Sequence, residues 1–250
     1  MAGGARSDQL VVIQIQKMFH GCVGTAHQRR FCKEYGLAYE RMIELGKEQR
    51  DLLKALVSVD LLSSIEDGLN SRNQHCNSNS GKVRVVMAAV VAGTYPQIAR
   101  IMRPPTRYVD TIGGALERDA DAKEMKFYIP SSSIDTSTTT STSTSNGTSN
   151  SVATSNYEKD DETNNISTAG FDRVFIHPSS LNFSNNSFKP SSFLLYSEIQ
   201  LSVGPTTTSN TSKVYLRECS EVYMYALLLF GGEIQANYSN GTISIDGWIR

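Results

Sequence analysis

The stretch Ile199-Gln200-Leu201-Ser202-Val203 alternates apolar and polar residues strictly, as a β-strand with one buried face does. Other short β-rich segments occur at 174–176, 214–216, 227–230 and 243–245. Between these segments lie turn-forming pairs: Gly204-Pro205, Gly231-Gly232 and Asn240-Gly241. About five short strands with no helix between them predict a small antiparallel β-barrel.

The first quarter of the chain, residues 1–62, is predicted to be helical. From Gln28 to Leu56 apolar residues recur mostly every three or four positions, and charged residues occupy the other face. Gly36 and Gly46 interrupt this pattern, so two packed helices fit it as well as one long helix. Residues 83–93 form an apolar run whose alanines favour a helix and whose valines favour a strand, and periodicity leaves both open.

Two segments are too polar to form a core. Residues 68–82 form a loop rich in Asn and Ser, and residues 131–156 are almost entirely Ser, Thr and Asn, followed by the acidic run 158–162. Such a composition buries too little apolar surface to offset the entropy of ordering the chain. We therefore predict a disordered insertion over residues 131–170.

The charge is uneven along the chain. The 250 residues carry a net charge of −1, but residues 1–130 hold 18 basic and 14 acidic side chains, whereas residues 131–250 hold 6 and 11. The near-neutral total excludes a polybasic coat protein without excluding a local basic patch. No apolar run is long enough to span a membrane. The four cysteines show no C-x-x-C pair, which is typical of reduced thiols in the cytosol.

The sequence carries none of the common catalytic motifs. It has no phosphate-binding G-x-x-x-x-G-K-[ST] loop, no H-E-x-x-H, no G-x-S-x-G and no G-x-G-x-x-G. We therefore expect no catalytic residues and no ATP hydrolysis by this chain alone. One group has zinc-ligand chemistry: His20, Cys22, His27 and Cys32. Its spacing matches no common zinc finger, so we predict no metal site there.

Candidate binding residues lie in the β-rich half. Lys213, Tyr215 and Arg217 alternate along one strand and must share a face, with Tyr196 nearby in the sequence. Cations and rings in this pattern suit phosphates and unpaired bases, although a solvated outer face would look the same. His177, Ser179 and Ser180 follow another strand and could either stabilise a turn or contact a phosphate backbone.

Several phrases of the sequence resemble one known family. They are Arg173-Val-Phe-Ile-His-Pro-Ser-Ser-Leu-Asn182, Phe193-Leu-Leu-Tyr-Ser-Glu198, Lys213-Val-Tyr-Leu-Arg-Glu218, Leu227-Leu-Leu-Phe-Gly-Gly232 and Ile243-Ser-Ile-Asp-Gly-Trp-Ile249. In this order they closely resemble the C-terminal OB-fold domain of DEAH/RHA-type (DExH-box) RNA helicases. Val86–Ile101, through its Ala92–Arg100 portion, is similar to a helical segment of that family, and Phe31–Leu53 to its helicase-associated ratchet helices.

The resemblance implies an α+β fold, in which a small ratchet-like helical domain precedes a small antiparallel OB-type β-barrel. The implied segments are 1–67 (helical region), 68–82 (polar loop), 83–102 (helix leading into the barrel), 103–130 (family-variable), 131–170 (disordered insertion) and 171–250 (barrel). The RecA-like motor domains, which use ATP and Mg²⁺ in the family, have no counterpart in this sequence. The chain is thus expected to be either a piece of a larger helicase or a natural relative without motors.

The family's architecture implies an RNA-binding accessory module of an ATP-dependent helicase. Its partners would be single-stranded RNA and motor domains in cis, with no cofactor of its own and a location in the cytoplasm or nucleus. The implied RNA contacts are Tyr196, Lys213, Tyr215, Arg217, His177, Ser179 and Ser180, approached past Arg84, Arg100, Arg103 and Arg107. The alternative is a module that docks a protein activator or a ribosomal subunit and binds no RNA. The phrases 227–234 and 244–249 look most like the branch acting in translation initiation.

Overall fold

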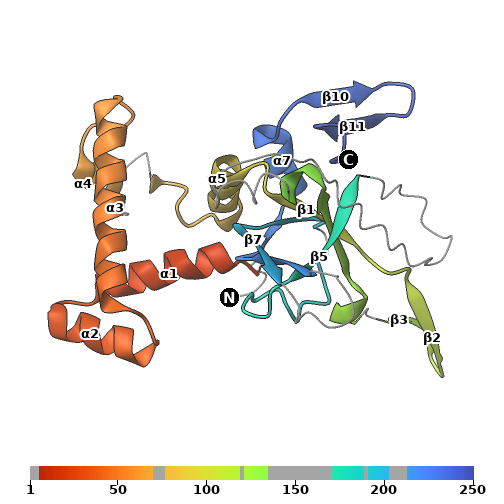
Figure 1. Cartoon of the computed structure of the whole chain (residues 1–250), viewed down its shortest axis with the longest axis horizontal. Coiled ribbons are helices and arrows are strands. Elements are labelled where there is room, and N and C mark those ends of the chain that lie inside the picture. Colours follow the sequence, from red (N-terminus) through yellow and green to blue (C-terminus); the bar gives the residue numbers. More distant parts are fainter. Residues whose placement is uncertain (1–5, 70–76, 119–120, 135–169, 189–190, 203–212) are drawn as a thin grey trace, which may run out of the picture.

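The structure is a computed structural model that describes residues 6–69, 77–118, 121–134, 170–188, 191–202 and 213–250. A helical arm leads into a curved β-sheet, and two hairpins extend from the sheet region (Figure 1). The α+β class is as predicted from the sequence. Most of the predicted disordered insertion, residues 135–169, lies outside the described residues.

The helical arm consists of three helices, α1 (Asp8–Gly21), α2 (Thr25–Glu34) and α3 (Tyr39–Ser58). They enclose a small core of Phe19, Phe31, Cys32 and Met42. The helical pattern is broken at Gly36, which has a φ of +66° that glycine adopts without strain. Gly46 instead lies inside α3, where a Cβ atom would approach the His20 ring to 3.3 Å. The two-helix interpretation of this segment is confirmed.

The ambiguous apolar run is helical. It forms α5 (Val83–Thr94), which buries Met87 and Val91, one turn apart, on a single face. The helix implied over residues 83–102 is thus confirmed only in its first part, because it ends at Thr94 and residues Ile98–Met102 form a strand. The short helix α4 (Ile65–Leu69) precedes it, packed against α3.

A seven-stranded sheet forms the centre of the molecule. Its strands are β1 (Ile98–Met102), β4 (Lys126–Pro130), β5 (Phe171–Ile176), β6 (Phe193–Leu195), β7 (Glu198–Ser202), β8 (Lys213–Arg217) and β9 (Ser220–Val222). Their order is β7-β8-β5-β4-β1-β6-β9. Every pair is antiparallel except β5 and β8, which are parallel.

Three details of the sheet correct the sequence prediction. The sheet begins at β1, far upstream of residue 171, because β1 and β4 lie at its centre. The β5–β8 pair makes the sheet mixed and not purely antiparallel. Within the described residues the end strands β7 and β9 do not pair with each other, so the barrel is not closed by hydrogen bonds.

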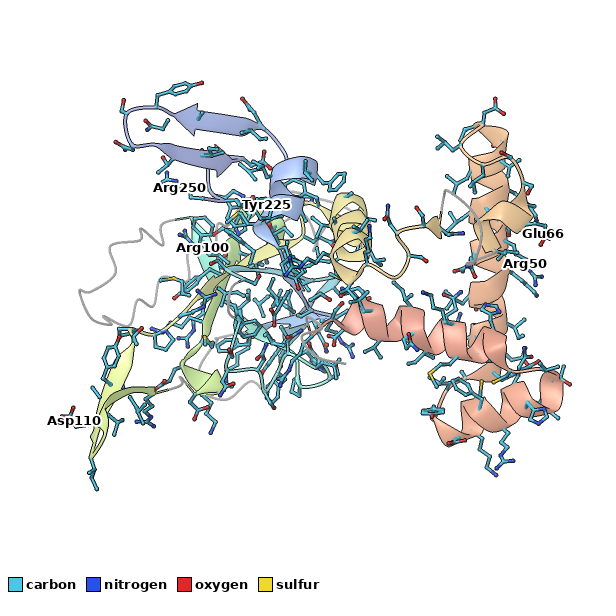
Figure 2. All side chains as sticks on the ribbon, turned by 180° about the vertical axis from the view of Figure 1, so that it is seen from behind. Arg50, Glu66, Arg100, Asp110, Tyr225 and Arg250 are labelled. Atoms are coloured by element: carbon cyan, nitrogen blue, oxygen red, sulfur yellow. The ribbon has the colours of Figure 1, made fainter. Side chains whose placement is uncertain are left out.

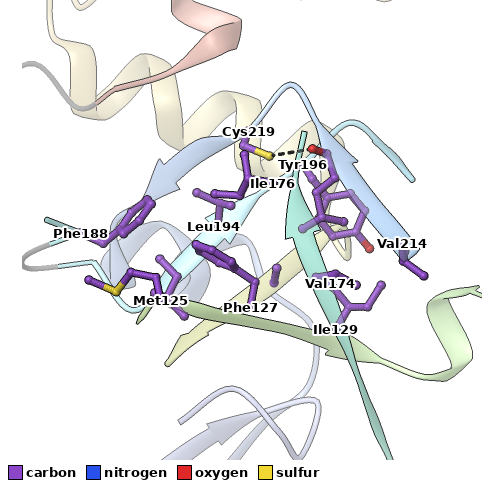
Figure 3. Packing of buried hydrophobic residues seen from close by; sticks show 13 residues of the cluster. Met125, Phe127, Ile129, Val174, Ile176, Phe188, Leu194, Tyr196, Val214 and Cys219 are labelled. Carbon is purple, nitrogen blue, oxygen red and sulfur yellow. Dashed lines mark hydrogen bonds between the residues drawn. The ribbon is translucent and has the colours of Figure 1, made fainter. Parts of the chain in front are cut away.

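The two faces of the sheet have different environments. The concave face buries a core that includes Ala99, Phe127, Val174, Leu194 and Leu216 (Figure 3). On the opposite face, the half formed by β1, β6 and β9 is covered by α5 and the C-terminal segment, with Ile98, Phe193 and Val222 buried there. Trp248 packs against Phe171 and Phe193. The buried cluster on this side includes no residue of β4, β5, β8 or β7, although Trp248 contacts Phe171 at the start of β5.

The predicted strand at 227–230 is wrong, because these residues belong to helix α7 (Met224–Phe230). Leu, Met and Ala are good helix formers, and an apolar run of this length does not distinguish a helix from a strand. Ala226 and Leu227 are buried in the cluster that includes Val91 of α5. The hairpin β10 (Ile234–Asn237) and β11 (Thr242–Ile245) follows α7, so the predicted strand at 243–245 is confirmed.

Asp246 fastens this C-terminal hairpin to α5. Its carboxylate accepts hydrogen bonds from the Tyr95 hydroxyl and from the Glu233 N–H, the latter at 2.8 Å. A Cβ atom on Gly232 would collide with the same carboxylate, so glycine is required there. Burial, followed by the hydrogen bond to Asp246, raises the pKa of Tyr95 to about 12.

The raised pKa of Tyr95 gives a prediction for alkaline pH. The ordinary tyrosine pKa is 10.0, so between pH 10 and 12 the unfolded chain loses a proton that the folded chain retains. The free energy of unfolding is therefore expected to fall over this range. Urea titrations at several pH values should show this decline, and Tyr95→Phe should reduce its slope. An equal slope in Tyr95→Phe would contradict the assignment.

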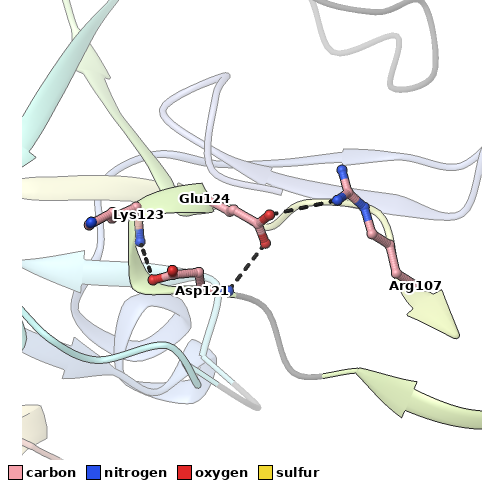
Figure 4. A network of polar contacts seen from close by, with 4 residues as sticks. All are labelled: Arg107, Asp121, Lys123 and Glu124. Carbon is pink, nitrogen blue, oxygen red and sulfur yellow. Dashed lines mark hydrogen bonds and ion pairs between the residues drawn. The ribbon is translucent and has the colours of Figure 1, made fainter. Parts of the chain in front are cut away.

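A second hairpin projects from the end of the sheet where β1 finishes and β4 begins. It consists of β2 (Arg107–Thr111) and β3 (Gly114–Arg118) and leads to a short 3₁₀ turn (Ala122–Glu124). An ion pair between Arg107 and Glu124, at 3.8 Å, links the hairpin to this turn, which Asp121 caps (Figure 4). The tip of the β2–β3 hairpin carries a fully exposed Ile112.

Candidate nucleic-acid interface

The outer face of the sheet carries cations and aromatic rings from neighbouring strands. Along β8, Val214 and Leu216 point into the core, which leaves Lys213, Tyr215 and Arg217 on the outer side. The predicted common face of these three side chains is therefore confirmed. Lys213 is exposed, and the other two are half-buried.

The adjoining strands extend this face. On β5, Val174 and Ile176 are buried, so Arg173 and Phe175 lie on the outer side. Phe175 is directly opposite Tyr215 across the β5–β8 pair, and Arg173 is opposite Tyr128 of β4. We call the set Tyr128, Arg173, Phe175, Lys213, Tyr215 and Arg217 the outer cation–ring face.

The rings and cations of this face contact one another. The guanidinium of Arg173 lies 5.3 Å from the centre of the Phe175 ring, and the ammonium of Lys213 lies 5.7 Å from it. Both distances are within the range of cation–π attraction. The Phe175 and Tyr215 ring centroids are 6.1 Å apart. Phe175 therefore holds two positive charges beside a tyrosine ring.

None of Arg173, Lys213 and Arg217 forms an ion pair with a carboxylate of the described part of the chain. The ion pairs found there are Arg41–Glu44, Lys54–Asp51 and Arg107–Glu124, all away from this face. Glu198 of β7 lies opposite Arg217 in the strand register without forming such a pair. Cations that lack a carboxylate partner are available to phosphate groups.

His177 and Ser179 lie at the end of β5, beside the outer cation–ring face. The His177 ring is 6.0 Å from that of Tyr215. Its Nδ1 atom accepts a hydrogen bond from the Ser179 N–H at 3.1 Å and lies 2.7 Å from the Ser179 hydroxyl. The imidazole thus stabilises the turn while its ring stays at the edge of the face. Both interpretations made from the sequence, turn and contact, are compatible with this position.

Two of the residues predicted to contact RNA are buried. Tyr196 is 3% exposed, lies among the core residues of the concave face (Figure 3), and has a pKa raised by burial. Ser180 is 6% exposed, and its Oγ accepts a hydrogen bond from the Asn182 N–H. Neither side chain is accessible to RNA. Tyr196 immediately follows β6 on the core side, a placement that its position in the sequence did not indicate.

The four arginines expected to line an approach to the RNA do not form one group. Arg103 donates to the backbone carbonyls of Phe188 and Ser191 and so holds a loop together. Arg84 lies over the Tyr223 ring, and Arg107 pairs with Glu124. Arg100 lies near Arg250 (Figure 2), and burial followed by this like charge lowers its pKa. The structure therefore does not support a common approach path made of these arginines.

The candidate zinc ligands of the sequence do not form a cluster in the part of the chain that the structure describes. No three His, Cys, Asp or Glu side chains of the described residues are grouped closely enough to hold a metal ion. His27 bonds the Val23 carbonyl, and Cys32 is buried in the helical core. No helix in the described ranges is long and apolar enough to cross a bilayer.

The sheet thus has one face that is filled by a hydrophobic core and an outer face that carries cations and aromatic rings. Residues 86–234 match the family model for the oligonucleotide/oligosaccharide-binding (OB)-fold. The chain belongs to this family, which is characteristic of the C-terminal region of DEAH/RHA helicases.

The relatives of this chain are helicases. It is 28% identical to "Putative ATP-dependent RNA helicase YLR419W" of Saccharomyces cerevisiae and 24% identical to "Putative DEAH-box ATP-dependent helicase UM11114" of Mycosarcoma maydis, each over 98% of this chain. It is 22% identical over its whole length to the human ATP-dependent DNA/RNA helicase DHX36. The chain spans 18%, 13% and 19% of these three proteins. It is therefore similar to an accessory region of helicases.

Sequence reasoning missed three members of the outer cation–ring face: Tyr128, Arg173 and Phe175. A signal for two of them was present, because Arg173-Val-Phe-Ile-His177 repeats the order of Lys213-Val-Tyr-Leu-Arg217. Each segment alternates a cation, a valine, a ring, an aliphatic residue and a basic residue. No comparable signal existed for Tyr128, because its position depends on the pairing of β4 with β5.

Proposed function

We propose that this chain is the RNA-binding accessory module of a DExH-box helicase and that it holds single-stranded RNA on the outer cation–ring face. The observation that carries the proposal is the set of cations, Arg173, Lys213 and Arg217, which have no carboxylate partner in the described residues and lie beside the Phe175 and Tyr215 rings. Cations beside rings suit a strand whose phosphates and bases are both accessible.

The position of the rings supports single-stranded over double-stranded RNA. Phe175 and Tyr215 lie on adjacent strands, so their side chains are neighbours on the outer surface of the sheet. An unpaired base can stack on such a ring, whereas the bases of a duplex are already stacked inside it. The rings would therefore favour unpaired RNA, and the cations would add affinity for the backbone of any sequence.

Salt dependence tests this proposal. The full chain should bind a fluorescein-labelled oligouridylate. The logarithm of the binding constant should fall linearly with the logarithm of the salt concentration, with a slope of about −2. This slope corresponds to roughly 0.7 for each of the three cations that would contact phosphates. Fluorescence anisotropy measures this slope. A blunt RNA duplex should bind more weakly than the single strand. Absence of binding at protein concentrations of about 10⁻⁴ M would contradict the proposal.

Protein docking is a second candidate function, favoured by an exposed apolar surface on α7 and the following hairpin. Tyr225 is 79% exposed and Leu229 73%, and Figure 2 shows Tyr225 at the surface of α7. Exposed apolar side chains that lie close together often mark an interface. The partner would be a protein such as a helicase activator or a ribosomal component, consistent with a cytoplasmic role in translation. Leu229→Asp should then abolish partner binding and leave RNA affinity unchanged.

A further inference from the structure

The loops that follow β5 and β8 are tied together by the first residue of α1. The Asp8 carboxylate accepts the Leu181 N–H at 2.9 Å through Oδ1 and the Cys219 N–H at 2.8 Å through Oδ2. The Asp8 N–H in turn donates to the Cys219 carbonyl at 3.2 Å. One carboxylate therefore connects two loops that are nearly forty residues apart in the sequence.

Neighbouring polar groups strengthen this junction. Ser7 caps α1 and lies 2.6 Å from the Ser220 hydroxyl, with both side chains buried. The fully buried Asn182 side chain donates to the carbonyls of Cys219, at 2.9 Å, and Arg6, at 3.1 Å. Burial, and then the nearby Asp8 charge, raises the pKa of the Cys219 thiol to about 12. The start of α1 is thus fixed to the barrel by a buried, hydrogen-bonded network.

The same two loops position the edge of the outer cation–ring face. His177 is the first residue after β5, four positions before Leu181, and Arg217 ends β8, two positions before Cys219. β5 and β8 are parallel, so no hairpin joins these ends. The His177 N–H donates to the Leu216 carbonyl at 2.9 Å, and the Asn182 side chain also links the two loops through the Cys219 carbonyl. Glu218, between Arg217 and Cys219, has a φ of +52°, so the backbone turns sharply directly after the face.

We propose that Asp8 is a positioning residue for RNA binding. By bridging the Leu181 and Cys219 amides, its carboxylate fixes His177 and Arg217 relative to each other. Binding of RNA to the outer cation–ring face is thereby linked to docking of α1 against the sheet. This inference rests on the proposed function. Because linkage is reciprocal, RNA on the face must stabilise the Asp8 bridge by the same factor that the bridge strengthens RNA binding.

The first test compares Asp8→Asn with Asp51→Asn. The asparagine retains the size of Asp8 but loses the charge and one of two acceptor oxygens, so oligouridylate affinity should fall roughly 5- to 10-fold, within the range of ordinary coupling between sites. Asp51 lies on α3, where it pairs with Lys54 at the surface, and Asp51→Asn makes the same chemical change away from the face. It should leave the affinity unchanged.

The second test is made on the wild-type chain and does not depend on any variant folding. Saturating oligouridylate should slow hydrogen exchange at the Leu181 and Cys219 amides, and it should leave the amides of α3 unchanged. If Asp8 had a purely structural role, RNA would not change the rate of hydrogen exchange at these two amides. Slower exchange at these two amides supports the inference even if Asp8→Asn does not fold.

The outcomes separate the two proposals. If the wild-type chain binds oligouridylate but exchange at both amides is unaffected, or a folded Asp8→Asn binds with wild-type affinity, the positioning role is wrong and the proposed function stands. If the wild-type chain does not bind oligouridylate at all, both proposals are wrong.

Discussion

The double variant Lys213→Ala/Arg217→Ala is expected to bind single-stranded RNA about 10- to 100-fold more weakly than the wild-type chain at low salt, and its salt slope should be smaller by about 1.4. Both side chains project from the outer side of β8 and have no carboxylate partner in the described residues. The slope becomes smaller because each lost phosphate contact means that one counterion fewer is released from the RNA on binding. Anisotropy titrations at about 50 and 200 mM salt measure the affinity and the slope together.

The matched control for this variant is Arg41→Ala/Lys54→Ala. It also removes one arginine and one lysine charge, but from α3, where both side chains form exposed ion pairs. Exposed pairs of this kind contribute little to stability, so the control should fold normally and retain RNA affinity. An equal loss of affinity in the control would show that net charge, and not the outer cation–ring face, determines binding.

The second large effect distinguishes two tyrosines that look alike in the sequence. Tyr196→Ala should lower the free energy of unfolding by about 3–5 kcal/mol, as expected for removal of a large buried ring from a packed core. Tyr215→Ala should change stability far less, because Tyr215 is half-buried on the outer face. It should instead weaken RNA binding by about 1–3 kcal/mol, the contribution of one stacked base.

Urea unfolding and anisotropy together check this pair of variants. Tyr196→Phe retains the ring and should bind RNA with wild-type affinity, losing at most about 1 kcal/mol of stability with the hydroxyl, which bonds Ser133. A Tyr196→Phe variant that folds normally but no longer binds RNA would contradict the burial of this side chain. A Tyr215→Ala variant with unchanged affinity would remove Tyr215 from the site.

Local patterns predicted much of the fold. The alternation at 213–217 correctly indicated a strand with a buried and an open face, because a period of two follows directly from strand geometry. The alternating segment that begins at Ile199 also forms a strand, β7, but its predicted buried face is wrong, because Ile199 is only partly buried and Leu201 is 42% exposed. The break between α2 and α3 at Gly36 was also visible, since a left-handed φ favours glycine. The apolar segment 227–230 was misassigned, because only packing against α5 shows that it is helical.

The candidate site was predictable only in part, because a surface depends on which strands become neighbours. The β8 side chains could be placed on one face from their spacing alone. Their pairing with Phe175 depends on the parallel β5–β8 contact, which joins strands separated by a long segment. Ser180 and Asn182 occur in a phrase shared with RNA helicases, yet in this structure they pack in the junction with α1. Shared phrases therefore indicated the family better than they indicated the contacts.

Photo-crosslinking tests the central claim most directly, because it locates bound RNA on the chain. The full chain would be irradiated with an oligonucleotide containing 4-thiouridine, and the crosslinked peptides would be identified by mass spectrometry. The account predicts crosslinks in the peptides that contain Tyr128, Phe175 and Tyr215, and their loss in Lys213→Ala/Arg217→Ala. Crosslinks confined to the helical arm or to α7 and the β10–β11 hairpin would contradict it.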